Sequence, residues 1–262
     1  MAWHLHLDVL AILIVLAVAY WYGLNRSQPA PRWLHPIERR PLFVFGLGFL
    51  VVFVAEGTAL HELSEQYLFS AHMVQHLLLT MVAPPLFMMG TPNWFLKPVL
   101  AHRRVLPVAR FLTSPIVAIA VFNLTLAFWH VPQLYEAGLQ NHNVHILNHI
   151  MYVIAAFVMW WPVLSPLPEL PRLAYPGQML YLFVQSLVPA VLASMITFSE
   201  TVIYPTYAAA PRIWDLSPLV DQQTGGLLMK IVGSLILWSL VVGIFFVWYN
   251  KEEREVEKFW DS

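Results

Sequence analysis

The sequence has no cysteine among its 262 residues, and only 11% of the residues are charged. Without thiols the chain cannot form disulfide bonds, iron–sulfur clusters or thiolate metal sites, so metal ligands must come from His, Met, Asp or Glu. By contrast, 59% of the residues are hydrophobic, too many to cover with polar side chains in water. We therefore expect a membrane protein.

The chain also lacks an excess of positive charge. Its 14 Lys and Arg residues are balanced by 15 Asp and Glu residues, which gives a net charge of −1. Nucleic-acid binding depends on a basic surface that neutralises phosphates. We therefore expect the lipid bilayer as a partner and no nucleic acid.

The apolar residues are concentrated in seven runs, each long enough to cross a bilayer as a helix. The runs cover about residues 7–24, 42–60, 68–90, 115–131, 145–164, 178–198 and 225–249. Their weak alternation is not typical of a transmembrane barrel. The sequence thus predicts an all-α, polytopic membrane bundle of seven transmembrane helices that forms a single domain over residues 1–262.

Basic residues are unevenly distributed between the two sides of this bundle. Twelve of the fourteen lie in the loops after the first, third and fifth runs or in the carboxyl-terminal tail, whereas only Arg212 and Lys230 lie on the other side. Loops rich in Lys and Arg remain in the cytoplasm. The pattern therefore predicts an amino terminus outside the cell, a cytoplasmic carboxyl terminus and an odd number of spans.

Nine of the eleven histidines fall on or near the predicted outer side. His72 and His76 are four residues apart, so both rings lie on one helical face. His142, His145 and His149 share an arc of about 60° on the fifth predicted helix. Neutral imidazole is a good ligand for copper or zinc. The two faces together predict a metal site near the outer leaflet.

Four further residues near this side are candidate metal ligands: His61, His130, Glu56 and Asp221. Glu56 lies inside the second predicted helix, where an ionised carboxylate needs a cationic partner, a metal or a proton. Asp221 offers a carboxylate just before the last predicted helix. Taken singly, His61 and His130 are equally consistent with ordinary residues at the level of the lipid headgroups.

Two further patterns concern copper. Thioether sulfur is a soft ligand for cuprous copper, although methionine is also ordinary packing material in apolar helices. The methionines considered are Met73, Met81, Met195 and Met229. If the initiator methionine is removed, the sequence Ala2-Trp3-His4 offers an amine, backbone nitrogens and an imidazole to cupric copper.

Several segments carry a resemblance to a known family: HMVQHLLL, APPLF, FNLTLAFWHVPQLY, HNVHILNH, WWPVLSP and DQQTGG. With them the chain resembles the CtaG family of seven-helix cytochrome c oxidase assembly factors, which are associated with caa-type oxidases. The resemblance implies a multi-pass protein of the bacterial plasma membrane that helps copper reach a haem–copper oxidase on the outer side. It implies oxidase subunits, and another copper chaperone, as partners.

The residues themselves favour a holding site for copper that releases the ion by stepwise ligand exchange, without thiolates. His72 and His76 would be primary ligands, and His145 and His149 would complete the site. His61, His130 and His142 would serve entry or exit of the ion. The bundle would then not act as an enzyme.

Two alternatives remain open from the sequence. Histidines with a carboxylate also activate water in zinc enzymes, so the same cluster could belong to an intramembrane zinc-dependent hydrolase. Histidines from two helices could instead bind the haem of a b-type cytochrome. The hydrolase predicts zinc with an open coordination position, and the cytochrome predicts a Soret band.

Overall fold

The structure, a computed structural model, describes residues 7–26 and 39–260. Over these ranges every regular element is a helix, which confirms the predicted all-α class. The pattern Ala2-Trp3-His4 lies outside the described residues.

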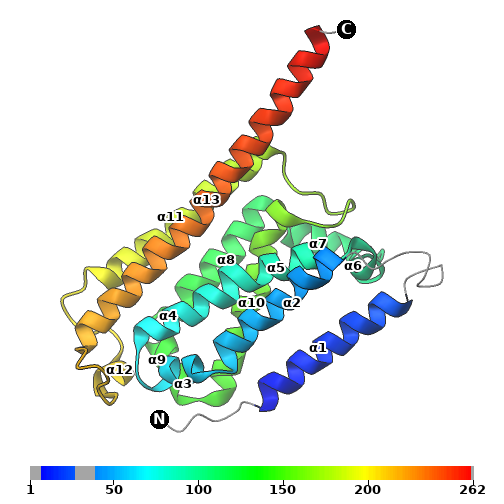
Figure 1. Cartoon of the computed structure of the whole chain (residues 1–262). Helices are drawn as coiled ribbons and strands as arrows, with labels where there is room; N and C mark the ends of the chain where they lie inside the picture. Colours follow the sequence, from blue (N-terminus) through cyan, green and yellow to red (C-terminus); the bar gives the residue numbers. More distant parts are fainter. Residues whose placement is uncertain (1–6, 27–38, 261–262) are drawn as a thin grey trace.

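Long helices run side by side through the molecule, and shorter ones gather near their ends (Figure 1). The long elements are α1 (Leu7–Arg26), α2 (Arg39–Glu56), α8 (Pro115–Trp129), α10 (His142–Leu164), α11 (Tyr175–Thr197) and α13 (Pro218–Trp260). One further rod joins α4 (Phe69–Leu77), the π-helix η1 (Leu78–Val82) and α5 (Ala83–Gly90). The short elements are α3 (Ala59–Gln66), α6 (Asn93–Leu100), α7 (Leu106–Leu112), α9 (Pro132–Gln140) and α12 (Pro205–Ala209).

Four helices of the described chain are long and apolar enough to cross a membrane, or up to six if each of two bent pairs forms one span. The four are Phe69–Gly90, His142–Leu164, Tyr175–Thr197 and Pro218–Glu255. The bent pairs are α2 with α3, at 44°, and α7 with α8, at 68°. The side chains of α1 are described only for residues 13–22, which form a shorter apolar stretch, so a seventh span and the orientation of the bundle stay predictions.

The predicted second span is not one helix, and the prediction of a continuous run over 42–60 is wrong. α2 ends at Glu56, and α3 begins at Ala59. Thr58 starts α3 as its N-cap, because its hydroxyl accepts a hydrogen bond from the backbone N–H of Leu60 at 3.3 Å. His61 consequently lies on a separate short helix.

The rod from α4 to α5 contains a π-helix where two prolines follow. Pro84 has no N–H to donate to the carbonyl of Thr80, which lies four residues earlier. The indole Nε1–H of Trp160, on α10, donates to that carbonyl instead, at 2.8 Å. This contact ties the two helices together at the point where the rod departs from α-helical geometry.

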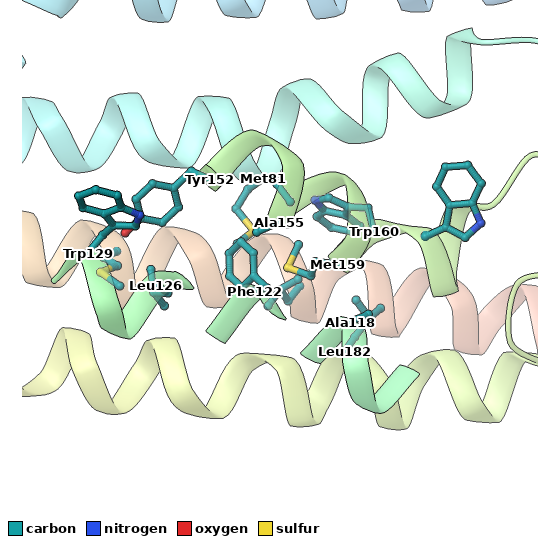
Figure 2. Close-up of a cluster of buried hydrophobic side chains, with 14 of the residues drawn as sticks. Met81, Ala118, Phe122, Leu126, Trp129, Tyr152, Ala155, Met159, Trp160 and Leu182 are labelled. Carbon is teal, nitrogen blue, oxygen red and sulfur yellow. The ribbon is translucent and has the colours of Figure 1, made fainter. Parts of the chain in front are cut away.

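A buried apolar core fills the space between α8, α10 and the η1 segment (Figure 2). In this view Phe122 of α8 lies beside Met159 of α10, and Leu126 lies toward Trp129 and Tyr152. Phe122 and Trp160 are almost completely buried. The core therefore fixes the relative position of the helices that carry the histidines.

The first turn of α13 holds α4 in place. The N-cap residue of α4 is Leu68, whose side chain has no oxygen that could accept hydrogen bonds from the free N–H groups of the first turn. The carboxylate of Asp221, in α13, accepts hydrogen bonds from the backbone N–H groups of Phe69 and Ser70 at 2.7 and 3.1 Å. A side chain added at Gly225 would collide with the ring of Phe69, so this glycine permits the close approach of the two helices.

Candidate metal centre

Seven ionisable side chains from four helices meet near the end of the bundle where α3, α9 and α12 lie (Figure 1). They come from the end of α2, from α3, from α4 and from the first turns of α10. The residues are Glu56, His61, Glu65, His72, His76, His145 and His149. We call the five members on α2, α3 and α10 the carboxylate cluster: Glu56, His61, Glu65, His145 and His149.

One group within the carboxylate cluster has the geometry of a metal site. A ligand atom from each of His61, Glu65 and His145 lies within 4.8 Å of the other two. The carboxylate Oε1 of Glu65 is 3.2 Å from His61 Nε2 and 2.8 Å from His145 Nε2. The pair with His145 is close but not aligned as a hydrogen bond. Two imidazoles and one carboxylate form a donor set that suits zinc or cupric copper.

Glu56 extends this group toward α4. Its two oxygens lie 3.2 Å from His61 Nδ1 and 3.0 Å from His149 Nδ1, so one carboxylate joins α3 to α10. His149 Nε2 is buried and has no hydrogen-bond partner among the described residues. A buried nitrogen without a partner is costly unless an ion or water is bound there. His149 therefore has a free donor atom for a metal.

His72 and His76 meet on one face of α4, as their spacing predicts. Their Nε2 atoms are 2.6 Å apart, and the Nδ1 atom of each is buried without a hydrogen-bond partner in the described part of the chain. Metal–nitrogen bonds of about 2.0 Å hold two cis ligand atoms about 3 Å apart, so a small shift would let both bind one ion. The ring of His76 is 5.7 Å from that of His149, which connects the pair to the carboxylate cluster.

Polar contacts from neighbouring helices hold the ring of His61. The amide Nε2 of Gln75 donates to the carbonyl of Ala55 at 3.1 Å and lies 2.9 Å from His61 Nδ1. The hydroxyl of Ser64 lies 2.6 Å from the carbonyl oxygen of the Gln75 side chain. These contacts orient the ring of His61, as hydrogen-bonding groups around a metal site commonly orient its ligands.

The α12 segment fixes α3 from the other side. The hydroxyl of Tyr207 donates to the backbone carbonyl of Ser64 at 2.6 Å. Burial raises the pKa of Tyr207, so its hydroxyl remains a neutral donor. A second tyrosine of this region, Tyr204, donates to the carbonyl of His130 at 3.1 Å.

The structure places the remaining sequence candidates elsewhere. His130 is buried at the end of α8 and is connected to His76 through Tyr152, whose ring lies 4.4 Å from that of His76. His142 is exposed on the first turn of α10. Asp221 lies inside α13, not before it, and its carboxylate caps α4. The structure thus shows Asp221 as the cap of α4, and its role as a metal ligand stays a prediction.

Glu65 is the functional candidate that the sequence prediction omitted. It follows His61 by four residues, so both side chains lie on one face of α3. The same spacing rule identified His72 and His76 as a pair. The segment HELSE therefore contained the signal, but it lay beyond the predicted end of the second span.

Known relatives of the chain include longer mycobacterial proteins. Uncharacterized proteins of Mycobacterium bovis and Mycobacterium tuberculosis are each 24% identical to it over 264 residues, which covers 92% of this chain and 38% of each relative. An uncharacterized protein of Mycobacterium leprae is 22% identical over 93% of this chain and 39% of its own length. The chain thus spans less than half the length of these relatives. No solved structure matches it.

A family model matches residues 18–251 of the chain, which is most of its length. The matched region contains the carboxylate cluster, His72 and His76, and the capping residue Asp221. The model is described as the cytochrome c oxidase caa3 assembly factor family, Caa3_CtaG. With this match over the helices that build the candidate site, the chain belongs to the Caa3_CtaG family of cytochrome c oxidase assembly factors.

Proposed function

We propose that this protein binds copper at the carboxylate cluster and assists its delivery to a haem–copper oxidase of the caa3 type. The observation that carries the proposal is the convergence of ligand atoms from His61, Glu65 and His145 within 4.8 Å. Two carboxylates in the cluster supply negative charge that offsets a divalent ion. Membership in a family of oxidase assembly factors supports the choice of partner.

The arrangement of histidines suits a carrier. From Glu65 the donor atoms continue through His61 to Glu56 and His149, and from there to His76 and His72, with neighbouring members in contact or with rings less than 6 Å apart. Each ion can therefore gain one ligand before it loses another, so that no step leaves it without donors in an apolar interior. A holding site of this kind performs no bond-breaking chemistry.

The distribution of charge supports an outer position for the cluster. Arg104 and Arg110 lie around α7, and Lys97 lies on α6. In Figure 1 these two helices are at the end of the bundle opposite α3 and α12. The positive-inside rule assigns the basic end to the cytoplasm, so the carboxylate cluster faces outward in this proposal.

Metal analysis of the purified protein tests the proposal. We expect copper to copurify with the wild type and to fall at least about tenfold in the double variant His61→Ala, His145→Ala, because each lost ligand weakens the site. The matched control is His142→Ala, on the same helix as His145 but exposed, which should retain the metal. Equal metal content in all three proteins would refute the site.

A second measurement tests the partner. Membranes from cells that carry the double variant should contain caa3-type oxidase with less copper and lower activity, and added copper salt should restore part of both. The His142→Ala strain should match the wild type. Full oxidase activity in the double variant would argue against copper delivery from this cluster.

One geometric feature favours an enzyme as the second candidate. Two histidines and a glutamate are the ligands of several zinc hydrolases, and Glu56 lies close enough to His61 to act as a base near such an ion. Zinc in the purified protein together with cleavage of lipid amides or esters would support this function. Copper without hydrolysis would exclude it. A haem of b type would instead give a Soret band, which we do not expect.

A further inference from the structure

A small cavity lies inside the bundle, lined by residues of α4 with η1, α8, α10, α11 and α13. Its volume is about 50 Å³. Three methionines line it, Met73, Met81 and Met229, and each is at most 9% exposed. The imidazoles of His76 and His130 line the same space. We call these five residues the methionine cavity.

His130 presents a free ring nitrogen in this cavity. Its Nδ1 lies 2.8 Å from the backbone carbonyl of Leu126, which can only accept, so Nδ1 carries the proton and the lone pair is on Nε2. His130 Nε2 is buried and has no hydrogen-bond partner in the described structure. A backbone carbonyl on Nδ1 is the usual way in which proteins fix the tautomer of a metal-binding histidine.

His76 contributes a second nitrogen. Its Nε2 contacts His72, whereas its Nδ1 is buried without a partner among the described residues. Two unpaired buried nitrogens around one cavity are unusual, because each costs about 1 to 3 kcal/mol when nothing binds it. The cavity therefore offers nitrogen donors that the rest of the fold does not satisfy.

The charge of the lining residues selects the kind of ion. No carboxylate is among the residues that line this cavity, so its possible ligand groups are neutral thioethers, imidazoles and hydroxyls. The desolvation cost of an ion rises with the square of its charge, so a divalent ion would be about four times as costly here as a monovalent one. Thioether sulfur also prefers cuprous copper.

Size excludes larger ligands. Sites for organic molecules usually occupy about 300 to 1,000 Å³, whereas this cavity of about 50 Å³ holds little more than an ion and a water molecule. A substrate lipid or a haem therefore does not fit. Of the four methionines considered as sulfur ligands, three line the cavity and only Met195 is exposed, at 67%.

We propose that the methionine cavity is a binding site for cuprous copper, with its ligands drawn from the thioethers of Met73, Met81 and Met229 and the imidazoles of His76 and His130. The site goes beyond the proposed function, since it lies outside the carboxylate cluster and is selective for a monovalent soft ion. It does not depend on the identity of any oxidase partner.

Titration with Ag⁺, a redox-inert stand-in for cuprous copper, tests the site in the full-length protein. We expect the double variant Met73→Leu, Met229→Leu to bind Ag⁺ at least about tenfold more weakly, since leucine keeps the volume of methionine but has no sulfur. The matched control Met195→Leu should bind as the wild type does. Unchanged Ag⁺ affinity in a double variant that elutes as a monodisperse, folded protein would overturn the proposal.

X-ray absorption at the copper edge gives a second readout that does not depend on variants. The chain has no cysteine, so any sulfur bound to cuprous copper must come from methionine. We expect sulfur in the coordination sphere of the reduced, copper-loaded wild type. A sphere of nitrogen and oxygen alone would overturn the proposal. Retention of Ag⁺ binding by His61→Ala, His145→Ala would show that this site is separate from the carboxylate cluster.

Discussion

The carboxylate cluster and the methionine cavity are neighbours, because the ring of His76 in the cavity lies 5.7 Å from the ring of His149 in the cluster, yet the two regions differ in charge, in the softness of their ligand atoms and in access. The cluster contains two carboxylates and is partly open, since Glu65 is half-buried at the end of the bundle. The cavity has neutral donors, and its methionines are buried. We therefore expect these two neighbouring parts of the bundle to favour different ions.

We expect this difference in lining residues to set the ion preference of each region. Imidazoles occur in both regions, so nitrogen ligands do not discriminate between the two kinds of ion. The discriminating residues are the glutamates on one side and the thioethers on the other, because negative charge offsets a divalent ion and soft sulfur favours a monovalent one. Substitutions that affect one region and spare the other are therefore informative.

The largest effect is expected where both regions depend on one contact. Asp221→Ala removes the acceptor that caps α4, the helix carrying His72, Met73 and His76. We expect the free energy of unfolding in detergent to fall by about 2 to 4 kcal/mol, with weaker binding of both divalent ions and Ag⁺. Glu253→Ala, exposed on the same helix, is the control. A stable variant that has lost only one of the two ions would contradict this role.

A smaller and selective effect is expected for Glu56→Gln. This change keeps the shape of the side chain but removes the charge that joins His61 to His149. Affinity for Zn²⁺ or Cu²⁺, measured by titration, should fall about 10- to 100-fold, whereas Ag⁺ affinity should not change. Glu200→Gln, at an exposed carboxylate, should leave both unchanged. Equal losses for the two ions would show that the regions form one site.

The smallest effect is expected far from both regions, at the pair of Lys97 Nζ and Glu169 Oε1, 2.6 Å apart. The hydrogen bond from Lys97 lowers the pKa of the Glu169 carboxyl. The pair therefore adds stability above the ordinary carboxyl pKa of about 4.3, and this stability is lost as the pH falls through the lower folded value. Unfolding of Glu169→Gln should differ slightly from the wild type at pH 7 and not at low pH, with metal binding unaffected. A change in either metal affinity would mean that the two ends of the bundle are coupled.

Local rules predicted the parts of the site that depend on local geometry. The i, i+4 spacing placed His72 beside His76, and the apolar runs identified most of the long helices, because both follow from helical periodicity. The position of Asp221 could not be predicted in this way. Its partner Phe69 lies 152 residues away, so its role depends on which helices pack together.

The sequence prediction missed the parts of the site that lie at breaks between helices. The short α3 places His61 and Glu65 at an angle to α2, and a hydrophobic run does not reveal such a bend. The methionines were also ambiguous from the sequence alone. Sulfur atoms in an apolar helix are ordinary packing groups until the fold shows which of them surround a cavity with unpaired nitrogens.

The helix α13 is much longer than a membrane span requires. At about 1.5 Å per residue, its 43 residues make a rod of about 65 Å, roughly twice the thickness of the hydrocarbon layer. In Figure 1 its carboxyl-terminal end projects beyond the other helices, while its first turn contacts α4 through Asp221. Each degree of rotation of α13 about its contact with α4 moves the carboxyl-terminal end of the helix by about 1 Å. Any tilt of α13 about its contact with α4 therefore displaces the carboxyl-terminal end of the helix more than any other part of it.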